Sequence, residues 1–277
     1  MTESHRESYL GPYRVEAFNA SKESENKIHD DTVARQFGFR GGLVPGVDVY
    51  AYMTHLPVLR WGRAWLERGT AECRLLKPVY DGDTAVVTGV NRAAELDLQI
   101  ESHGELCVTG RAGLSSEPVP PPFSFGEAPL PPTERPPADE TSLAIGTRLA
   151  MNPFSVTDEY AEEYLRTVRE TEPLYARENL VHPGTILHIG NWVLRHNVVL
   201  GPWMHVGSTV QHFAAAHIGD ELSARAVVTA NYERKGHRFV ELDVLAYAGE
   251  KTPIARLGHI AIYRPRQLAD TAYGRVE

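Results

Sequence analysis

The sequence contains little cysteine and no long hydrophobic run, and both absences exclude classes of protein. Its 277 residues include only two cysteines, Cys73 and Cys107, which lie far apart. This argues against a disulfide scaffold or a cysteine-type zinc site and fits a reducing compartment. No window approaches the ~20 unbroken apolar residues of a membrane helix, and the polar N-terminus lacks the features of a secretory signal. We therefore expect a cytoplasmic protein with no membrane partner.

Basic residues are also sparse, and they are scattered. The formal net charge is -8, and no run of four or more Lys or Arg occurs. Proteins that bind nucleic acid usually present a basic stripe, so no nucleic-acid partner is expected. A few local basic residues could still bind an anionic small molecule. Hydrophobic residues make up 42% and charged residues 23%, which is typical of a globular protein.

A proline-rich stretch divides the chain. Nine of the 19 prolines lie within residues 118–137. Proline has no backbone N–H and favours extended backbone, so this stretch is expected to be neither a helix nor a central strand. It is interpreted as a semi-rigid linker between an N-terminal domain, residues 10–117, and a C-terminal domain, residues 138–266.

The two flanks resemble each other. Each contains a short apolar segment, a Pro-Gly pair and an apolar run typical of a helix. Each then continues into segments in which apolar and polar residues alternate and which a Gly-Asp pair interrupts. The two Pro-Gly pairs are 138 residues apart and the two Gly-Asp pairs are 137 residues apart. Two landmarks at nearly the same offset indicate a duplicated domain.

Each half is predicted to hold one buried central helix and several antiparallel strands. The helices are expected at residues 44–59 and 184–198, with a short helix at 31–37. Val, Thr and Tyr enrichment and the turn pairs predict the strands. They are expected at residues 13–18, 70–79, 84–91, 96–102, 106–114, 207–215, 221–231, 238–247 and 254–263.

This order of elements, with the turn Pro78-Val79-x-x-Gly82-Asp83, resembles the hotdog fold. The segments SENKIHDD (24–31) and GFRGGLVPG (38–46) resemble the MaoC-like, or R-specific enoyl-CoA hydratase, family. Two copies in one chain resemble the double-hotdog members of that family. The resemblance implies an α+β fold of tandem double hotdog type, with each helix wrapped by a curved antiparallel sheet, and a hydratase or dehydratase that acts on an acyl thioester.

The family motif, Asp-x-Asn-Pro-x-His, implies a candidate catalytic loop. His29 matches the family histidine and Asn26 the asparagine, whereas Ser24 takes the place of the aspartate. A serine cannot replace a carboxylate as a base at neutral pH. Glu25 or Asp31 could supply the carboxylate if the loop path differs from that of the family.

The second half departs further from the motif. Glu170 falls on the aspartate position and Tyr175 on the histidine position, while His182 lies one residue before the place of the family's helix-opening histidine. In double hotdogs of this type one half often keeps the chemistry. These three residues are therefore assigned to substrate binding.

The residues themselves also suggest a site at the first central helix. The helix opening at Gly46 offers free N–H groups and a partial positive charge, which suit a thioester oxygen. Val44 and Tyr50 are predicted to contact the substrate beside it. His29 can exchange a proton near neutral pH. The alternatives are that the Pro-Gly pair only turns the chain and that His29 is an exposed residue beside a helix cap.

Three functions remain open. The first is a hydro-lyase acting on an enoyl or 3-hydroxyacyl thioester of CoA or a carrier protein. The second is a hotdog enzyme of altered chemistry, such as a thioesterase, an isomerase or a dehydratase of a non-thioester substrate, and the third is a non-catalytic acyl-binding subunit. No metal-ligand spacing such as His-Glu-x-x-His and no nucleotide fingerprint occurs, so no metal or cofactor is expected. The aromatic content, with four Trp and 12 Tyr, would suit a further interface, and a homodimer is expected.

Overall fold

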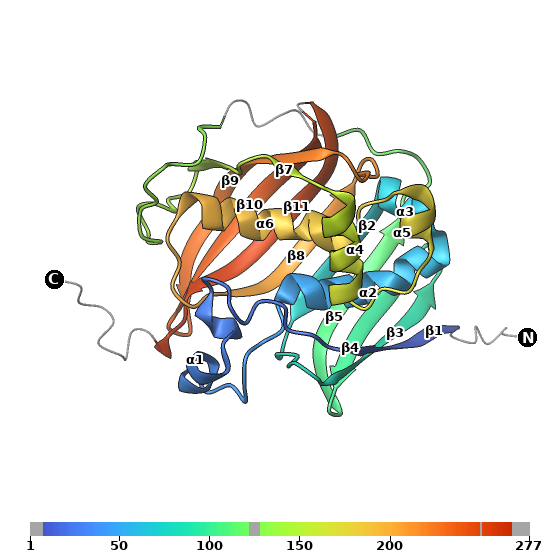
Figure 1. Ribbon diagram of the computed structural model, residues 1–277, viewed down its shortest axis with the longest axis horizontal. Helices are drawn as coiled ribbons and strands as arrows, with labels where there is room; N and C mark the ends of the chain where they lie inside the picture. Colours follow the sequence, from blue (N-terminus) through green and yellow to red (C-terminus); the bar gives the residue numbers. More distant parts are fainter. Residues whose placement is uncertain (1–7, 122–127, 250, 268–277) are drawn as a thin grey trace, which may run out of the picture.

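The computed structural model describes residues 8–121, 128–249 and 251–267. In this part the chain forms two similar α+β halves that share one continuous eleven-stranded sheet (Figure 1). The sheet curves around two central helices, α2 (Gly46–Trp61) and α6 (Pro183–Asn197), which lie on the same face of it. The expected tandem hotdog arrangement is therefore confirmed.

The first half follows the predicted order of elements. Its strands are β1 (Tyr9–Glu16), β2 (Gly69–Leu75), β3 (Thr84–Arg92), β4 (Glu95–Ser102) and β5 (Glu105–Leu114). The 3-10 turn η1 (Lys27–His29) and the helix α1 (Asp31–Gln36) precede α2, and α3 (Arg63–Arg68) follows it. Residues 76–79, expected as strand, leave β2 and line a cavity instead.

The second half adds elements that were not expected. Helices α4 (Asp158–Thr167) and α5 (Leu174–Glu178) precede α6, and the strands are β6 (Arg148–Ala150), β7 (Phe154–Ser155), β8 (Met204–His212), β9 (Glu221–Arg234), β10 (His237–Ala248) and β11 (Thr252–Arg264). The Gly-Asp turns lie where the sequence placed them. Gly82 and Gly219 have φ of +74° and +96°, a region that favours glycine.

The two halves join through their sheets and through their central helices. Strands β2 and β8 pair antiparallel in the middle of the strand order, which runs β1-β3-β4-β5-β2-β8-β11-β10-β9-β6, with β7 paired to β9. Helix α2 is buried on most sides because the sheet covers one side and α6 contacts another. One hydrophobic core therefore runs through both halves.

The proline-rich stretch contains no helix and no strand over its described residues, 118–121 and 128–137. Near its end, Val199 donates a backbone hydrogen bond to the Pro136 carbonyl at 2.8 Å and accepts one from Ala138 N at 2.9 Å. The end of the stretch is thus fixed to the second half. Residues 122–127 of the predicted linker lie outside the described part, and the domain boundaries 10–117 and 138–266 stay predictions. Over the described residues, no helix combines the length and the hydropathy that crossing a bilayer requires.

Candidate functional site

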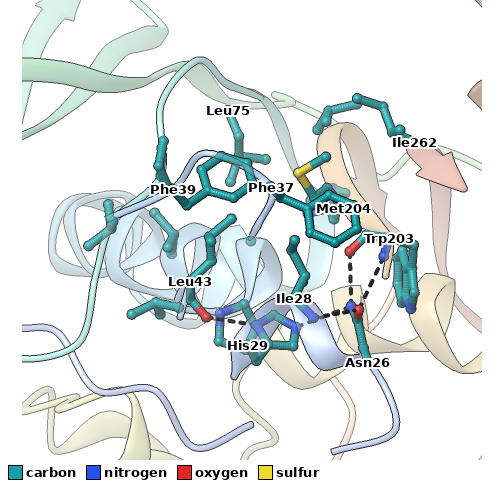
Figure 2. A pocket seen from close by; sticks show the side chains of 18 of the residues that line it. Asn26, Ile28, His29, Phe37, Phe39, Leu43, Leu75, Trp203, Met204 and Ile262 are labelled. Carbon is teal, nitrogen blue, oxygen red and sulfur yellow. Dashed lines mark hydrogen bonds between the residues drawn. The ribbon is translucent and has the colours of Figure 1, made fainter. Parts of the chain in front are cut away.

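A cavity of about 370 Å³ lies at the junction of the two halves. Its wall is mostly apolar, and the aromatic side chains of Phe37 and Phe39 lie close to Met204 in it (Figure 2). The lining residues are Asn26, Ile28, His29, Phe37, Phe39, Leu43, Val44, Pro45, Gly46, Val49, Leu75, Leu76, Lys77, Pro78, Val79, Asn191, Trp203, Met204, His205, Val206, His237, Ile262, Arg266 and Gln267.

His29 borders this cavity, and both of its ring nitrogens have hydrogen-bonding partners in the chain. Asn26 caps η1 and Asp30 caps α1, so the loop holds His29 between two fixed turns. His29 Nδ1 lies 2.7 Å from the Leu43 carbonyl, which can only accept, so Nδ1 carries the proton. Nε2 therefore presents its lone pair, and Asn26 Nδ2 lies 3.3 Å from it.

Burial sets the charge state of His29. The pKa of His29 is lowered because burial disfavours the charged ring, although its bond to Leu43 and the negative charge of Asp48 act in the opposite direction. The charges of His188 and Arg195 lower it further. At neutral pH the ring is accordingly neutral, which is the form that can accept a proton.

Asn26 joins the His29 loop to the second half. Its Nδ2 donates to the Trp203 carbonyl at 2.9 Å, and its Oδ1 accepts from Trp203 N at 3.1 Å (Figure 2). The same side chain is 8% exposed. The polar atoms of the Asn26 side chain are thus all hydrogen-bonded to protein groups. This arrangement fixes the position of His29 and leaves the amide no free atom with which to hold water.

The opening of α2 lies in the cavity wall without a side-chain cap. Pro45 precedes the helix, and the first backbone bonds run from Asp48 N and Val49 N to the Pro45 carbonyl. The Gly46 N–H is one of the free donors that begin any α-helix. A Cβ at Gly46 would lie 2.9 Å from both His205 Nδ1 and Leu75 Cδ2, so any larger residue would require these side chains to shift. Val44 lines the cavity beside it.

The structure places the other three predicted residues of the first half outside this cavity. Glu25 is a surface residue that pairs with Arg135 at 3.3 Å, and that bond lowers its pKa. Asp31 accepts from Gly42 N at 2.7 Å. Tyr50 lies in the core, where burial raises its pKa well above the usual value. The group that orients His29 is therefore a backbone carbonyl, not the expected carboxylate of Glu25 or Asp31.

The three predicted residues of the second half form a separate buried cluster. Glu170 Oε1 lies 2.7 Å from His55 Nδ1, and Glu170 Oε2 lies 3.4 Å from His182 Nε2. Burial would raise the pKa of Glu170, but the bonds from His182 and His55 lower it strongly. His182 Nδ1 accepts from Gly184 N and so caps α6, and its ring packs on Tyr175. None of the three predicted residues lines the cavity described above.

A buried polar cluster of His205, Ser208 and His259 lies at the cavity wall and was not predicted from the sequence. His205 Nε2 lies 2.7 Å from Ser208 Oγ, and the His205 and His259 rings stack with centroids 4.6 Å apart. Burial lowers the pKa of His205 to about 4 and that of His259 well below the usual value, so both rings are neutral. Asn191 and Trp203 were missed as well. No spacing in the sequence marks these residues, because they reach the cavity only through the packing of the two halves.

The part of the chain that the structure describes contains no group of three or more His, Cys, Asp or Glu side chains that could hold a metal ion.

Comparison with known proteins bears on the fold. The chain matches no protein-family model, and no curated protein sequence matches it. Among solved structures, a conserved hypothetical protein from Mycobacterium tuberculosis with a double hotdog fold has a TM-score of 0.66 at 14% identity, over 93% of this chain and 96% of that chain. A MaoC domain protein from Chloroflexus aurantiacus has a TM-score of 0.62 at 11% identity, over 94% of this chain and 95% of that chain.

A third structure, a MaoC-like dehydratase, has a TM-score of 0.55 at 13% identity, over 93% of this chain and 98% of that chain. At these identities the likeness concerns the fold, and it extends over nearly the whole length of each protein. The chain is therefore a double hotdog protein, and it shares its fold with these MaoC-like proteins.

Proposed function

We propose that the protein is a hydro-lyase that adds water to an enoyl thioester, or removes it from a 3-hydroxyacyl thioester, of CoA or a carrier protein. The observation that carries the proposal is the placement of His29. Its unprotonated Nε2 borders an apolar cavity whose wall also contains the uncapped opening of α2. A base and a set of free N–H donors at one cavity are the groups that hydration of a thioester requires.

In the proposed reaction the thioester oxygen accepts a hydrogen bond from the Gly46 N–H. His29 Nε2 takes a proton from water while the water oxygen bonds to the β-carbon of the enoyl group. The electron pair of the double bond moves toward the carbonyl, and the resulting enolate is stabilised by the positive end of α2. The α-carbon then receives the proton from His29, and dehydration follows the same steps in reverse.

The cavity favours a short acyl group. Its volume of about 370 Å³ lies near the lower end of the range of small-molecule sites, roughly 300–1,000 Å³. Apolar side chains from both halves surround it, so the acyl group would be buried there. Lys77 and Arg266 line the same cavity. Lys77 is paired with Glu105, so the charge of Arg266 is the one that would suit a phosphate of a carrier group.

The test is the hydration of crotonyl-CoA by the purified protein, followed by the loss of absorbance of the conjugated thioester. Longer enoyl-CoA esters are assayed in parallel, and release of free thiol is measured in the same samples. Hydration that depends on His29 is the expected result. Thiol release without hydration would instead support the alternative thioesterase chemistry. A wild-type protein that turns over none of these esters would overturn the proposal.

A further inference from the structure

Two residues that line the cavity carry a buried polar atom with no hydrogen-bonding partner among the described residues. They are His205, through Nδ1, and Asn191, through Oδ1, and the proposed reaction uses neither. A buried polar group without a partner costs free energy, so two of them in one cavity wall point to a ligand that completes them. An unpaired nitrogen alone is not sufficient. His212, on the same strand as His205, also has one, but its ring packs against Trp65 outside this cavity.

The unpaired nitrogen of His205 presents a lone pair. His205 Nε2 lies 3.1 Å from the Gly207 carbonyl, which can only accept, and 2.7 Å from Ser208 Oγ. The proton is therefore on Nε2, and Nδ1 can only accept a hydrogen bond. Burial lowers the pKa of His205 to about 4, so the ring keeps this neutral form at neutral pH. A ligand that completes Nδ1 must therefore be a donor, as a hydroxyl group is.

Direct contacts place this nitrogen at the opening of α2. A Cβ built on Gly46 would lie only 2.9 Å from His205 Nδ1, so the backbone of Gly46 borders that atom. The His205 ring also stacks on His259, with centroids 4.6 Å apart. A Cβ built on Gly190, the neighbour of Asn191, would lie 2.6 Å from His259 Nδ1. An unbroken set of contacts thus runs from the α2 opening to the segment of α6 that carries Asn191.

We propose that His205 and Asn191 form a subsite for the hydroxyl group of a 3-hydroxyacyl ligand. When the thioester oxygen accepts from the Gly46 N–H, the 3-hydroxyl is close to that oxygen and therefore close to His205 Nδ1, to which it donates. The Asn191 amide carries both a donor and an acceptor and can turn either toward the hydroxyl oxygen or its proton. The identity of the ligand as an acyl thioester rests on the proposed function, whereas the need for a donor at His205 follows from the cavity itself.

The test compares, by calorimetry, the binding of 3-hydroxybutyryl-CoA and of butyryl-CoA, which differ only in the hydroxyl. It is done in the His29→Gln background, in which turnover does not disturb the titration. This protein should bind the hydroxy ester about tenfold more tightly, because the other ester leaves His205 Nδ1 unpaired. His205→Phe, which keeps a planar ring, and Asn191→Leu, which keeps the side-chain size, should each lower that ratio toward one. The control is His212→Phe, which removes an unpaired buried ring of the same strand outside the cavity and should leave the ratio unchanged.

Equal affinity for the two esters would overturn the inference, as would a ratio that survives His205→Phe or one that is lost equally in His212→Phe. If His205→Phe does not fold, the ratio in Asn191→Leu decides alone. A preference for the hydroxy ester without hydration by the wild type would refute the proposed function and leave the subsite standing. Hydration without that preference would do the reverse, and binding of neither ester would overturn both.

Discussion

The hydrogen bonds of Asn26 test whether contacts between the two halves fix the position of His29. The change Asn26→Ala removes the hydrogen bonds to the N–H and the carbonyl of Trp203, a residue 177 positions away. It also removes the contact between Asn26 Nδ2 and His29 Nε2. The side chain that couples the His29 loop to the second half is then lost, while the backbone of α1 and α2 stays the same.

The size of the effect follows from burial. Asn26 and Trp203 are 8% and 4% exposed, so the two backbone groups of Trp203 would lose partners that water cannot easily replace. Each unsatisfied buried group costs about 1–3 kcal/mol, and the two together should lower the free energy of unfolding by about 3 kcal/mol. The longer bond to Ile28 N, at 3.4 Å, adds little.

Urea unfolding of Asn26→Ala and wild type measures this loss. The control is Asn91→Ala, in which a more exposed amide loses its bonds to the Ser8 carbonyl and hydroxyl, and which should cost less than about 1 kcal/mol. Turnover should fall in Asn26→Ala, because His29 is no longer fixed. If Asn26→Ala is as stable as Asn91→Ala, the hydrogen bonds between Asn26 and Trp203 do not hold the two halves together, and the reasoning is refuted.

Three further predictions concern the site and its surroundings. His29→Gln, which can still donate to the Leu43 carbonyl, should lower hydration turnover by about 10²–10⁴-fold with no loss of stability in thermal unfolding. Gly46→Ala should lower both turnover and stability, the latter by about 1–3 kcal/mol in urea unfolding, because the new Cβ crowds His205 and Leu75; full activity would contradict the tight fit. Burial lowers the pKa of His205 and of His212 to about 4, so the unfolded chain takes up protons first as the pH falls below about 6.5. Each residue should therefore cost about 2 kcal/mol of stability between pH 7 and pH 5, and His212→Leu should flatten that pH dependence.

The fold was largely readable from the sequence, because its signals are local and repeated. The near-constant offset of the Pro-Gly and Gly-Asp pairs predicted the duplication, and the apolar runs predicted the two central helices, α2 and α6, to within two residues at each end. The strand expected over residues 70–79 ends at Leu75, since the following residues turn away to line the cavity. Helices α4 and α5 were not predicted, although η1 and α1 occupy the corresponding place before α2 in the first half.

The sequence by itself determined that His29 and Gly46 belong to one short stretch around the start of a buried helix, because a turn and a helix opening are set by neighbouring residues. Only the tertiary structure decided their partners. The Leu43 carbonyl, and not the expected carboxylate, accepts the hydrogen bond from His29. Asn26 donates to the Trp203 carbonyl, and Glu170 pairs with His55 of the first half. These contacts depend on how two halves pack across the β2–β8 pairing, and no local spacing encodes which buried polar groups that packing brings within hydrogen-bonding distance.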